Sequence, residues 1–317
     1  MPTNSETVKP LEAIAVMQAR HHGYVLFGRL LLEGLTPELL PFVQQIPELA
    51  TAASPFYNDD IAAASYQNIF GFNLFPFQSI FLDDTGLVGG RETRRVQAFF
   101  LKIGYEGVTD VGPDHIGQLL LCLAALCDDG AKKGRQQAEL LDQHLLRWLL
   151  PFCCALKQQG HDFYTPLADL LLAFVADHAR DLADELGGQR PFTLPQPPDI
   201  LSNKKNGWKE ISAFLLTPVA TGIYLGRDHI ATLARQFKLP RGFGDRQQML
   251  VNLFQSAMVY DGFGDVMSEL MRITAEYQSH YAANLSSFPQ DAALANQWQT
   301  QAAQTGEFLT KLKSLVA

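Results

Sequence analysis

Apolar positions recur every three or four residues along most of the chain, which is the period of an amphipathic α-helix. One such stripe lies near the N-terminus, and two more lie in the middle of the chain. Their members are Tyr24, Phe27, Leu31 and Leu35; Leu141, Leu145, Trp148, Phe152 and Leu156; and Leu167, Leu170, Leu171, Phe174, Val175 and Leu182. No alternation of strand period reaches a useful length. The pattern predicts an all-α helical bundle of about a dozen helices.

Three further segments refine this prediction. Residues 116–127 are apolar almost all round, which predicts a central helix covered on every side. Asp245 and Gln248 have the spacing of a capping box, which predicts a helix that begins there and ends near Tyr260. The last predicted helix has an apolar face formed by Phe308, Leu309, Leu312, Leu315 and Val316.

The stretch 187–199 interrupts the helical pattern. It contains two glycines and four prolines, so neither a helix nor a central strand can run through it. A chain of 317 residues also favours two domains slightly over one. We therefore divide the chain into a helical domain over residues 1–190, a proline-rich linker over 191–199 and a helical C-terminal extension over 200–317.

Charge differs between the two parts. Residues 1–190 carry 14 Lys and Arg against 23 Asp and Glu, a net charge of −9, whereas residues 191–317 carry 11 against 10, a net charge of +1. Nucleic-acid binding needs clustered cations, so the acidic first part argues against it and for a cationic partner. Solubility alone is the alternative explanation for an acidic surface.

The four cysteines, Cys122, Cys127, Cys153 and Cys154, lie in apolar stretches where a thiol packs as a small hydrophobic group. The longest apolar run, residues 119–127, is much shorter than a membrane span, and no secretory signal pattern opens the chain. These features predict a reduced, soluble, cytoplasmic protein without a membrane span.

Residues 66–81, YQNIFGFNLFPFQSIF, form an aromatic segment with an irregular pattern. Glycine and proline interrupt it, so it is neither a clean amphipathic helix nor a strand. Its aromatic residues are Tyr66, Phe70, Phe72, Phe75, Phe77 and Phe81. Either these rings line one concave binding surface, or they fill the core of the bundle.

Residues 104–119, GYEGVTDVGPDHIGQL, predict a loop that ends at the start of the apolar central helix. Asp114 is placed to cap that helix, because its carboxylate can accept from the free N–H groups of the first turn. His115 would then lie at the first helical position as a polar surface residue, a donor to a bound peptide or a pH-sensitive group.

Enzyme signatures are largely missing. The sequence contains no GxGxxG after a strand, no phosphate loop, no HExxH, no CxxC and no GxSxG elbow. A metal site made of Asp114, His115 and a remote ligand has little support. We therefore predict a protein that is not an enzyme and has no metal or other cofactor.

Several short motifs, in order, resemble the TorD/DmsD/NarJ family of molybdoenzyme maturation chaperones over about residues 10–186. The matching residues are Pro76, Phe77, Ser79, Ile80 and Phe81; Pro113, Asp114 and His115; Leu119–Leu121; His144, Leu145 and Trp148; and Phe163, Tyr164, Leu167 and Ala168. The sequence departs from the family at Phe77, where relatives often have Trp or Tyr. About 120 residues after the linker also exceed the compact family members.

The resemblance implies a TorD-like, all-helical cytoplasmic chaperone that binds the twin-arginine leader, or the apo form, of a molybdopterin oxidoreductase. Such a leader offers an apolar stretch for aromatic residues and two arginines for nearby acids, here Asp83, Asp84, Glu92, Asp110 and Asp114. The predicted client-binding residues are Tyr66, Phe70, Phe72, Pro76, Phe77, Ser79, Phe81, Asp110, Pro113, Asp114 and His115.

Two other functions stay open. The long C-terminal part fits an assembly factor that binds the folded body of a molybdoenzyme subunit without its leader. The Asp114–His115 pair leaves a weak nucleotide-binding or hydrolysing activity as a third hypothesis. The glycine-rich loop 104–112 is a plausible hinge for a homodimer formed by helix exchange. The sequence does not name the client enzyme.

Overall fold

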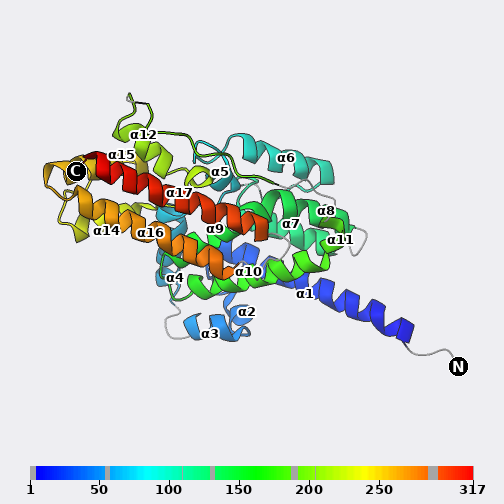
Figure 1. Ribbon diagram of the computed structural model, residues 1–317. Helices are drawn as coiled ribbons and strands as arrows, with labels where there is room; N and C mark the ends of the chain where they lie inside the picture. Colours follow the sequence, from blue (N-terminus) through cyan, green and yellow to red (C-terminus); the bar gives the residue numbers. More distant parts are fainter. Residues whose placement is uncertain are drawn as a thin grey trace.

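The computed structural model describes residues 5–53, 58–108, 110–128, 133–186, 192–203, 205–284 and 292–316, with side chains from residue 14 onward. Helices dominate these ranges, and no β-strand occurs within them. The prediction of an all-α fold is therefore confirmed. The start of α1 (Ser5–Glu33) projects beyond its neighbours at one end of an elongated molecule, and the end of α17 (Ala292–Val316) lies at the other end (Figure 1).

The first part of the chain surrounds the central helix α7, as the apolar sequence of residues 116–127 predicts. Most residues of α7 are buried. The backbones of α1 and α7 pack so closely that a Cβ added to Gly117 would lie only 2.7 Å from the Gly28 carbonyl oxygen. The helices of this part are α1 (Ser5–Glu33), α2 (Leu40–Val43), α3 (Pro47–Ala53), α4 (Asp59–Tyr66), α5 (Gln78–Leu82), α6 (Arg91–Ile103), α7 (Ile116–Asp128), α8 (Gly134–Leu140), α9 (Leu146–Lys157), α10 (Tyr164–Asp181) and α11 (Ala183–Leu186). Two π-helical segments, η1 (Gln67–Asn73) and η3 (Leu141–Leu145), precede α5 and α9.

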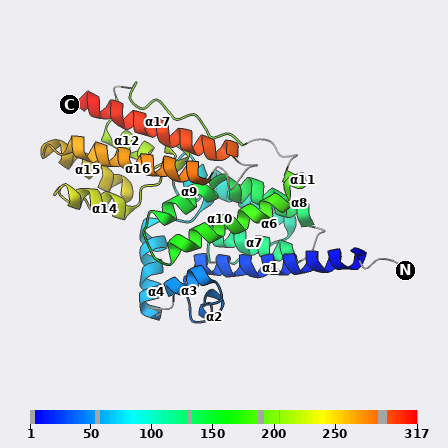
Figure 2. The ribbon, with the colours of Figure 1, turned by 60° about the horizontal axis from the view of Figure 1, so that its bottom comes forward.

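The C-terminal part is also helical. It consists of α12 (Trp208–Leu215), α13 (Pro218–Thr221), α14 (Arg227–Gln236), α15 (Arg246–Val259), α16 (Phe263–Asn284) and α17 (Ala292–Val316). The Asp245 half of the predicted capping box is present, since the Gln248 N–H donates to Oδ1 of Asp245 at 2.8 Å, whereas the Gln248 side chain donates to Oδ1 of Asn252. Helices α16 and α17 run side by side in opposite directions and pack on α9 (Figures 1 and 2).

A proline inside α9 helps to join the two parts. Pro151 has no N–H, so the carbonyl of Arg147, four residues earlier, loses its helical partner. The indole N–H of the buried Trp298 on α17 donates to that carbonyl at 3.0 Å. The hydrogen bond removes an unsatisfied acceptor from α9 and fixes α17 against it.

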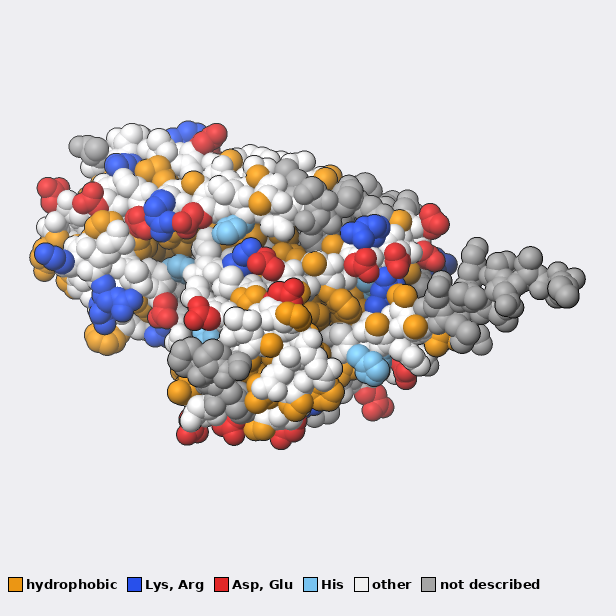
Figure 3. All heavy atoms as spheres, turned by 90° about the horizontal axis from the view of Figure 1, so that it is seen from below, with side chains coloured by type: hydrophobic (Ala, Val, Ile, Leu, Met, Phe, Trp, Pro, Cys, Tyr) orange, Lys and Arg blue, Asp and Glu red, His pale blue; other side chains and the backbone are white. Residues whose placement is uncertain are grey.

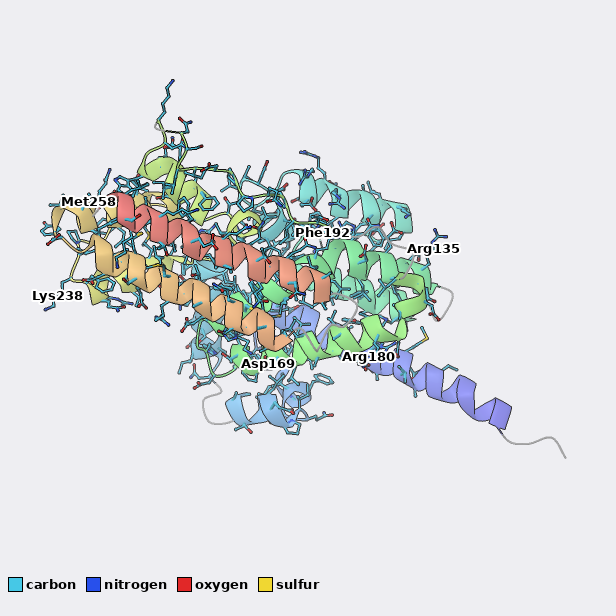
Figure 4. All side chains as sticks on the ribbon, viewed as in Figure 1. Arg135, Asp169, Arg180, Phe192, Lys238 and Met258 are labelled. Carbon is cyan, nitrogen blue, oxygen red and sulfur yellow. The ribbon has the colours of Figure 1, made fainter. Side chains whose placement is uncertain are left out.

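The proline-rich stretch lies on this body over the residues that the structure describes, from Phe192 onward. The ring of Phe192, labelled in Figure 4, lies 4.6 Å from the guanidinium carbon of Arg147. Leu194 is buried, and its N–H donates to Oε1 of Gln297 at 2.7 Å. The division into domains 1–190 and 200–317 stays a prediction, but the intervening stretch packs against both α9 and α17.

Candidate functional site

The two segments that carry the sequence motifs meet in a short antiparallel bridge. The Gln78 N–H donates to the Asp114 carbonyl, and the Ile116 N–H donates to the Pro76 carbonyl, both at 2.9 Å. Between these bonds Phe77 lies opposite His115, and their rings meet edge to face with centroids 4.9 Å apart. The bridge positions the start of α5 beside the start of α7.

Asp114 caps a helix, but a different one from that expected. Its side chain is fully buried, and Oδ2 accepts from the Ser79 N–H at 3.0 Å. The carboxylate therefore caps the first turn of α5, to which the bridge brings it, and not the first turn of α7. The expectation that it caps its own helix is wrong. Its other oxygen, Oδ1, is buried without a hydrogen-bond partner among the described residues.

His115 takes over the cap of α7. The Gly117 N–H donates to its Nδ1 at 3.1 Å, so Nε2 carries the ring hydrogen. Burial lowers the pKa of His115 to about 3, which keeps the ring neutral near pH 7. His115 is 5% exposed, so it is not the polar surface residue that one of the three interpretations described.

The six aromatic side chains of residues 66–81 do not share one surface. Phe81 is fully buried, with its ring between Trp148 and Tyr224 at centroid distances of 5.3 and 5.5 Å. Phe70 is buried against Tyr66 and Tyr164. Phe75 and Phe77 are half-buried, whereas Phe72 is 51% exposed.

The remaining predicted binding residues also divide between the core and the surface. Pro76 and Ser79 are buried, and the Ser79 hydroxyl accepts from the Gly89 N–H at 3.1 Å. Pro113 is half-buried and Asp110 is exposed. Of the predicted set, Phe72 and Asp110 are exposed and Tyr66, Phe77 and Pro113 are half-buried, whereas Asp114 and Phe81 are fully buried.

Two of the acids expected to attract arginines already have partners. Glu92 is buried, and its carboxylate accepts from Gln78 Nε2 at 2.7 Å and from Arg95 at 3.0 Å. Asp83 is buried and accepts from the Glu92 N–H at 3.2 Å. Asp84 and Asp110 are exposed. The buried acids build the turn between α5 and α6.

The C-terminal part covers the aromatic segment. The amide of Asn73 donates to Asp228 Oδ2 and accepts from the Asp228 N–H, both at 2.8 Å. The Tyr224 hydroxyl accepts from the Phe75 N–H at 3.2 Å. Arg246 lies over the rings of both Phe75 and Tyr224. Residues 73–81 thus form much of the surface on which the extension packs.

Two pockets outside the predicted set adjoin each other at the turn between α9 and α10. The apolar pocket, about 650 Å³, lies between α3, α4 and the start of α10 and is lined by residues that include Leu35, Ala52, Ile61, Phe163 and Tyr164. The acidic pocket, about 600 Å³, lies between that turn, α14 and α16 and is lined by residues that include Asp228, His229, Glu269, Arg272, Glu276 and His280. Both pockets include Gly160 and His161.

Figure 3 shows the underside of the molecule, where hydrophobic side chains gather in the lower part and acidic side chains follow the lower edge. No single sequence motif marks the two pockets, because their residues come from segments up to 245 positions apart, Leu35 to His280. The sequence motif around Phe163 and Tyr164 was the one signal that pointed to this region.

The described residues offer little for metal or thiolate chemistry. No group of three or more His, Cys, Asp or Glu side chains within them is arranged to hold a metal ion. Burial raises the pKa of Cys127 to about 11 and of Cys154 to about 12, so both thiols stay protonated near neutral pH. No described helix combines the length and hydrophobicity that a membrane crossing needs.

The described residues form a helical body with pockets between its helices. Residues 41–154 match the family described as nitrate reductase delta subunit, a family of the NarJ/TorD chaperone type. The match confirms the resemblance over these residues; the motif at Phe163, Tyr164, Leu167 and Ala168 lies outside them. The family consists of maturation chaperones of molybdoenzymes and not of catalysts. No curated protein matches the chain.

Proposed function

We propose that this protein is a cytoplasmic chaperone that binds the twin-arginine leader of a molybdopterin-dependent oxidoreductase and keeps the precursor from export until its cofactor is inserted. The family match over residues 41–154 carries the proposal, because members of this family act with molybdoenzymes of the nitrate reductase type. The net charge of −9 on residues 1–190 supports it, since a leader with two arginines is cationic.

The binding strength should suit a client that must be released. A dissociation constant near 1 µM corresponds to about −8 kcal/mol. Burial of about 400 Å² of apolar leader supplies about 10 kcal/mol before the costs of association and ordering. Exposed charge pairs add only about 0–1 kcal/mol each, so they set selectivity more than affinity.

The test is calorimetric titration of the full chain with a leader peptide from a molybdoenzyme of the same organism. The matched peptides carry alanine or lysine in place of both arginines. We expect micromolar binding of the native peptide, weaker binding of the lysine peptide and the weakest binding of the alanine peptide. Equal affinity for all three would contradict recognition of the arginine pair.

A second candidate, an assembly factor that binds the folded enzyme body, is favoured by one surface. Met258, Val259 and Tyr260 at the end of α15 are 44%, 77% and 63% exposed, and Met258 lies at the tip of the molecule (Figure 4). Adjacent exposed apolar side chains are typical of an interaction surface. Capture of the enzyme body without its leader, lost in Val259→Ser, would support this function over leader binding.

A further inference from the structure

We propose that the apolar and acidic pockets on either side of Gly160–His161 form one docking surface for a peptide segment in which two arginines adjoin an apolar stretch. The inference rests on the proposed function, because a twin-arginine leader is a segment of this kind. It places the leader away from the bridge of Phe77 and His115. It also gives the C-terminal extension a direct part in binding, through α14 and α16.

The apolar pocket provides a place for the hydrophobic stretch. Ile61 on its wall is 57% exposed, and Leu35 and Phe163 also line the pocket. Glu48 and Asp162 also line this pocket. An apolar hollow with carboxylates on its lining suits a hydrophobic segment that is flanked by positive charge, and its volume is that of ordinary ligand sites.

The acidic pocket provides the matching charge. Asp228, Glu269 and Glu276 line it together with a single arginine, Arg272, which leaves two negative charges in excess. Its three histidines, His161, His229 and His280, have pKa values lowered chiefly by burial, so they add no charge near pH 7. Two arginines of a bound segment would balance this excess.

The carboxylates are also arranged for guanidinium groups. Arg272 lies between Glu269, at 2.7 Å, and Glu276, and all three belong to one face of α16. The Arg272 side chain is 53% exposed and can turn outward. Each of these carboxylates contacts Arg272 through Oε1, so its second oxygen, Oε2, can accept from a further guanidinium.

The turn between the pockets leaves room for a chain to pass. Gly160 has a φ of +64°, and a Cβ added to it would meet nothing within 4 Å. His161 accepts from the Phe163 N–H at Nδ1, and His229 accepts from the Gly226 N–H at Nδ1. Both rings therefore present Nε2–H, a donor suited to the carbonyl groups of a bound peptide.

The test compares variants of the full chain in the same calorimetric titration. Glu269→Gln with Glu276→Gln should weaken the native leader about tenfold and leave affinity for the alanine peptide unchanged. Ile61→Ser should weaken both peptides alike, because it alters only the apolar pocket. The matched control, Asp265→Asn with Glu307→Gln, removes the same charge from exposed sites on α16 and α17 and should bind as the unaltered chain does.

The outcomes separate the two proposals. If the unaltered chain binds no leader, the proposed function fails and this inference falls with it. If the unaltered chain binds the leader and both pocket variants bind it as tightly as the unaltered chain does, the leader binds elsewhere. In that case only the proposed location is overturned. All four substituted carboxylates and Ile61 lie outside the core, so we expect every variant to fold. A melting curve of each variant checks this.

Discussion

Phe81 gives the sharpest test of how the two parts of the chain are joined. Its ring is fully buried between Trp148 of α9 and Tyr224 of the C-terminal part. Removal of a buried phenylalanine side chain costs about 3–5 kcal/mol, and ring contacts with Trp148, Phe152 and Tyr224 place Phe81→Ala at about 4 kcal/mol. That loss reduces the folding equilibrium constant about a thousandfold.

The assay is urea unfolding followed by tryptophan fluorescence and by circular dichroism. With a slope of about 3 kcal/mol per M, Phe81→Ala should lower the midpoint by about 1.3 M. The control is Phe72→Ala, whose ring is 51% exposed and whose loss should cost less than about 0.5 kcal/mol. Equal shifts in the two variants would refute the reasoning.

Tyr224→Ala completes a double-mutant cycle with Phe81→Ala. A direct ring contact predicts a coupling of about 0.5–1.5 kcal/mol between the two substitutions. Purely additive effects would mean that Tyr224 does not pack on Phe81 in solution. The cycle therefore measures the contact between the extension and the first part without any truncation.

Three other predictions concern buried polar groups. Asp114→Ala should destabilise the protein by about 1–3 kcal/mol, because the Ser79 N–H loses its acceptor, whereas Asp114→Asn keeps an acceptor oxygen and should cost less in the same urea assay. Trp298→Phe should cost about 1–3 kcal/mol by leaving the Arg147 carbonyl unpaired, and a cost no larger than that of Phe72→Ala would contradict that role. Burial lowers the pKa of His178 from 6.5 to about 3. The stability that the neutral, buried His178 contributes is therefore complete above pH 6.5 and is lost as the pH falls toward 3. His178→Gln should make the fall of the urea midpoint between pH 6.5 and pH 4 less steep.

Helical periodicity was enough to predict the fold class, because helix stripes depend on local spacing. The stripe that contains Leu167, Leu171 and Val175 is the buried face of α10, and residues 116–127 form the buried α7. The capping pair at Asp245 and Gln248 also depends on residues three apart, and it marks the start of α15 as predicted. Each of these features is encoded within a few turns of chain.

The roles of individual site residues could not be predicted in the same way. Asp114 caps α5 only because the bridge places it beside Ser79, 35 positions earlier. Phe81 is a core residue only because Tyr224 covers it from a segment beyond the proline-rich stretch. A pattern of aromatic residues cannot distinguish a binding surface from a packing surface when the covering segment lies more than 100 residues away.

The position of the extension changes how binding experiments on the motif residues must be interpreted. Substitution of Phe81 or Asp114 destabilises the core, so a lower apparent affinity for the leader would reflect a smaller folded fraction of the protein. Removal of residues 200–317 would both expose Phe81 and delete the carboxylates of α14 and α16, so it cannot separate stability from recognition. Paired point variants can separate the two effects. Tyr224→Phe removes the hydroxyl contacts to Phe75 and Arg246, whereas Glu269→Gln changes the acidic pocket. If the leader binds at Gly160–His161, Tyr224→Phe should lower the urea midpoint and leave leader affinity unchanged. Glu269→Gln should lower leader affinity and leave the urea midpoint unchanged.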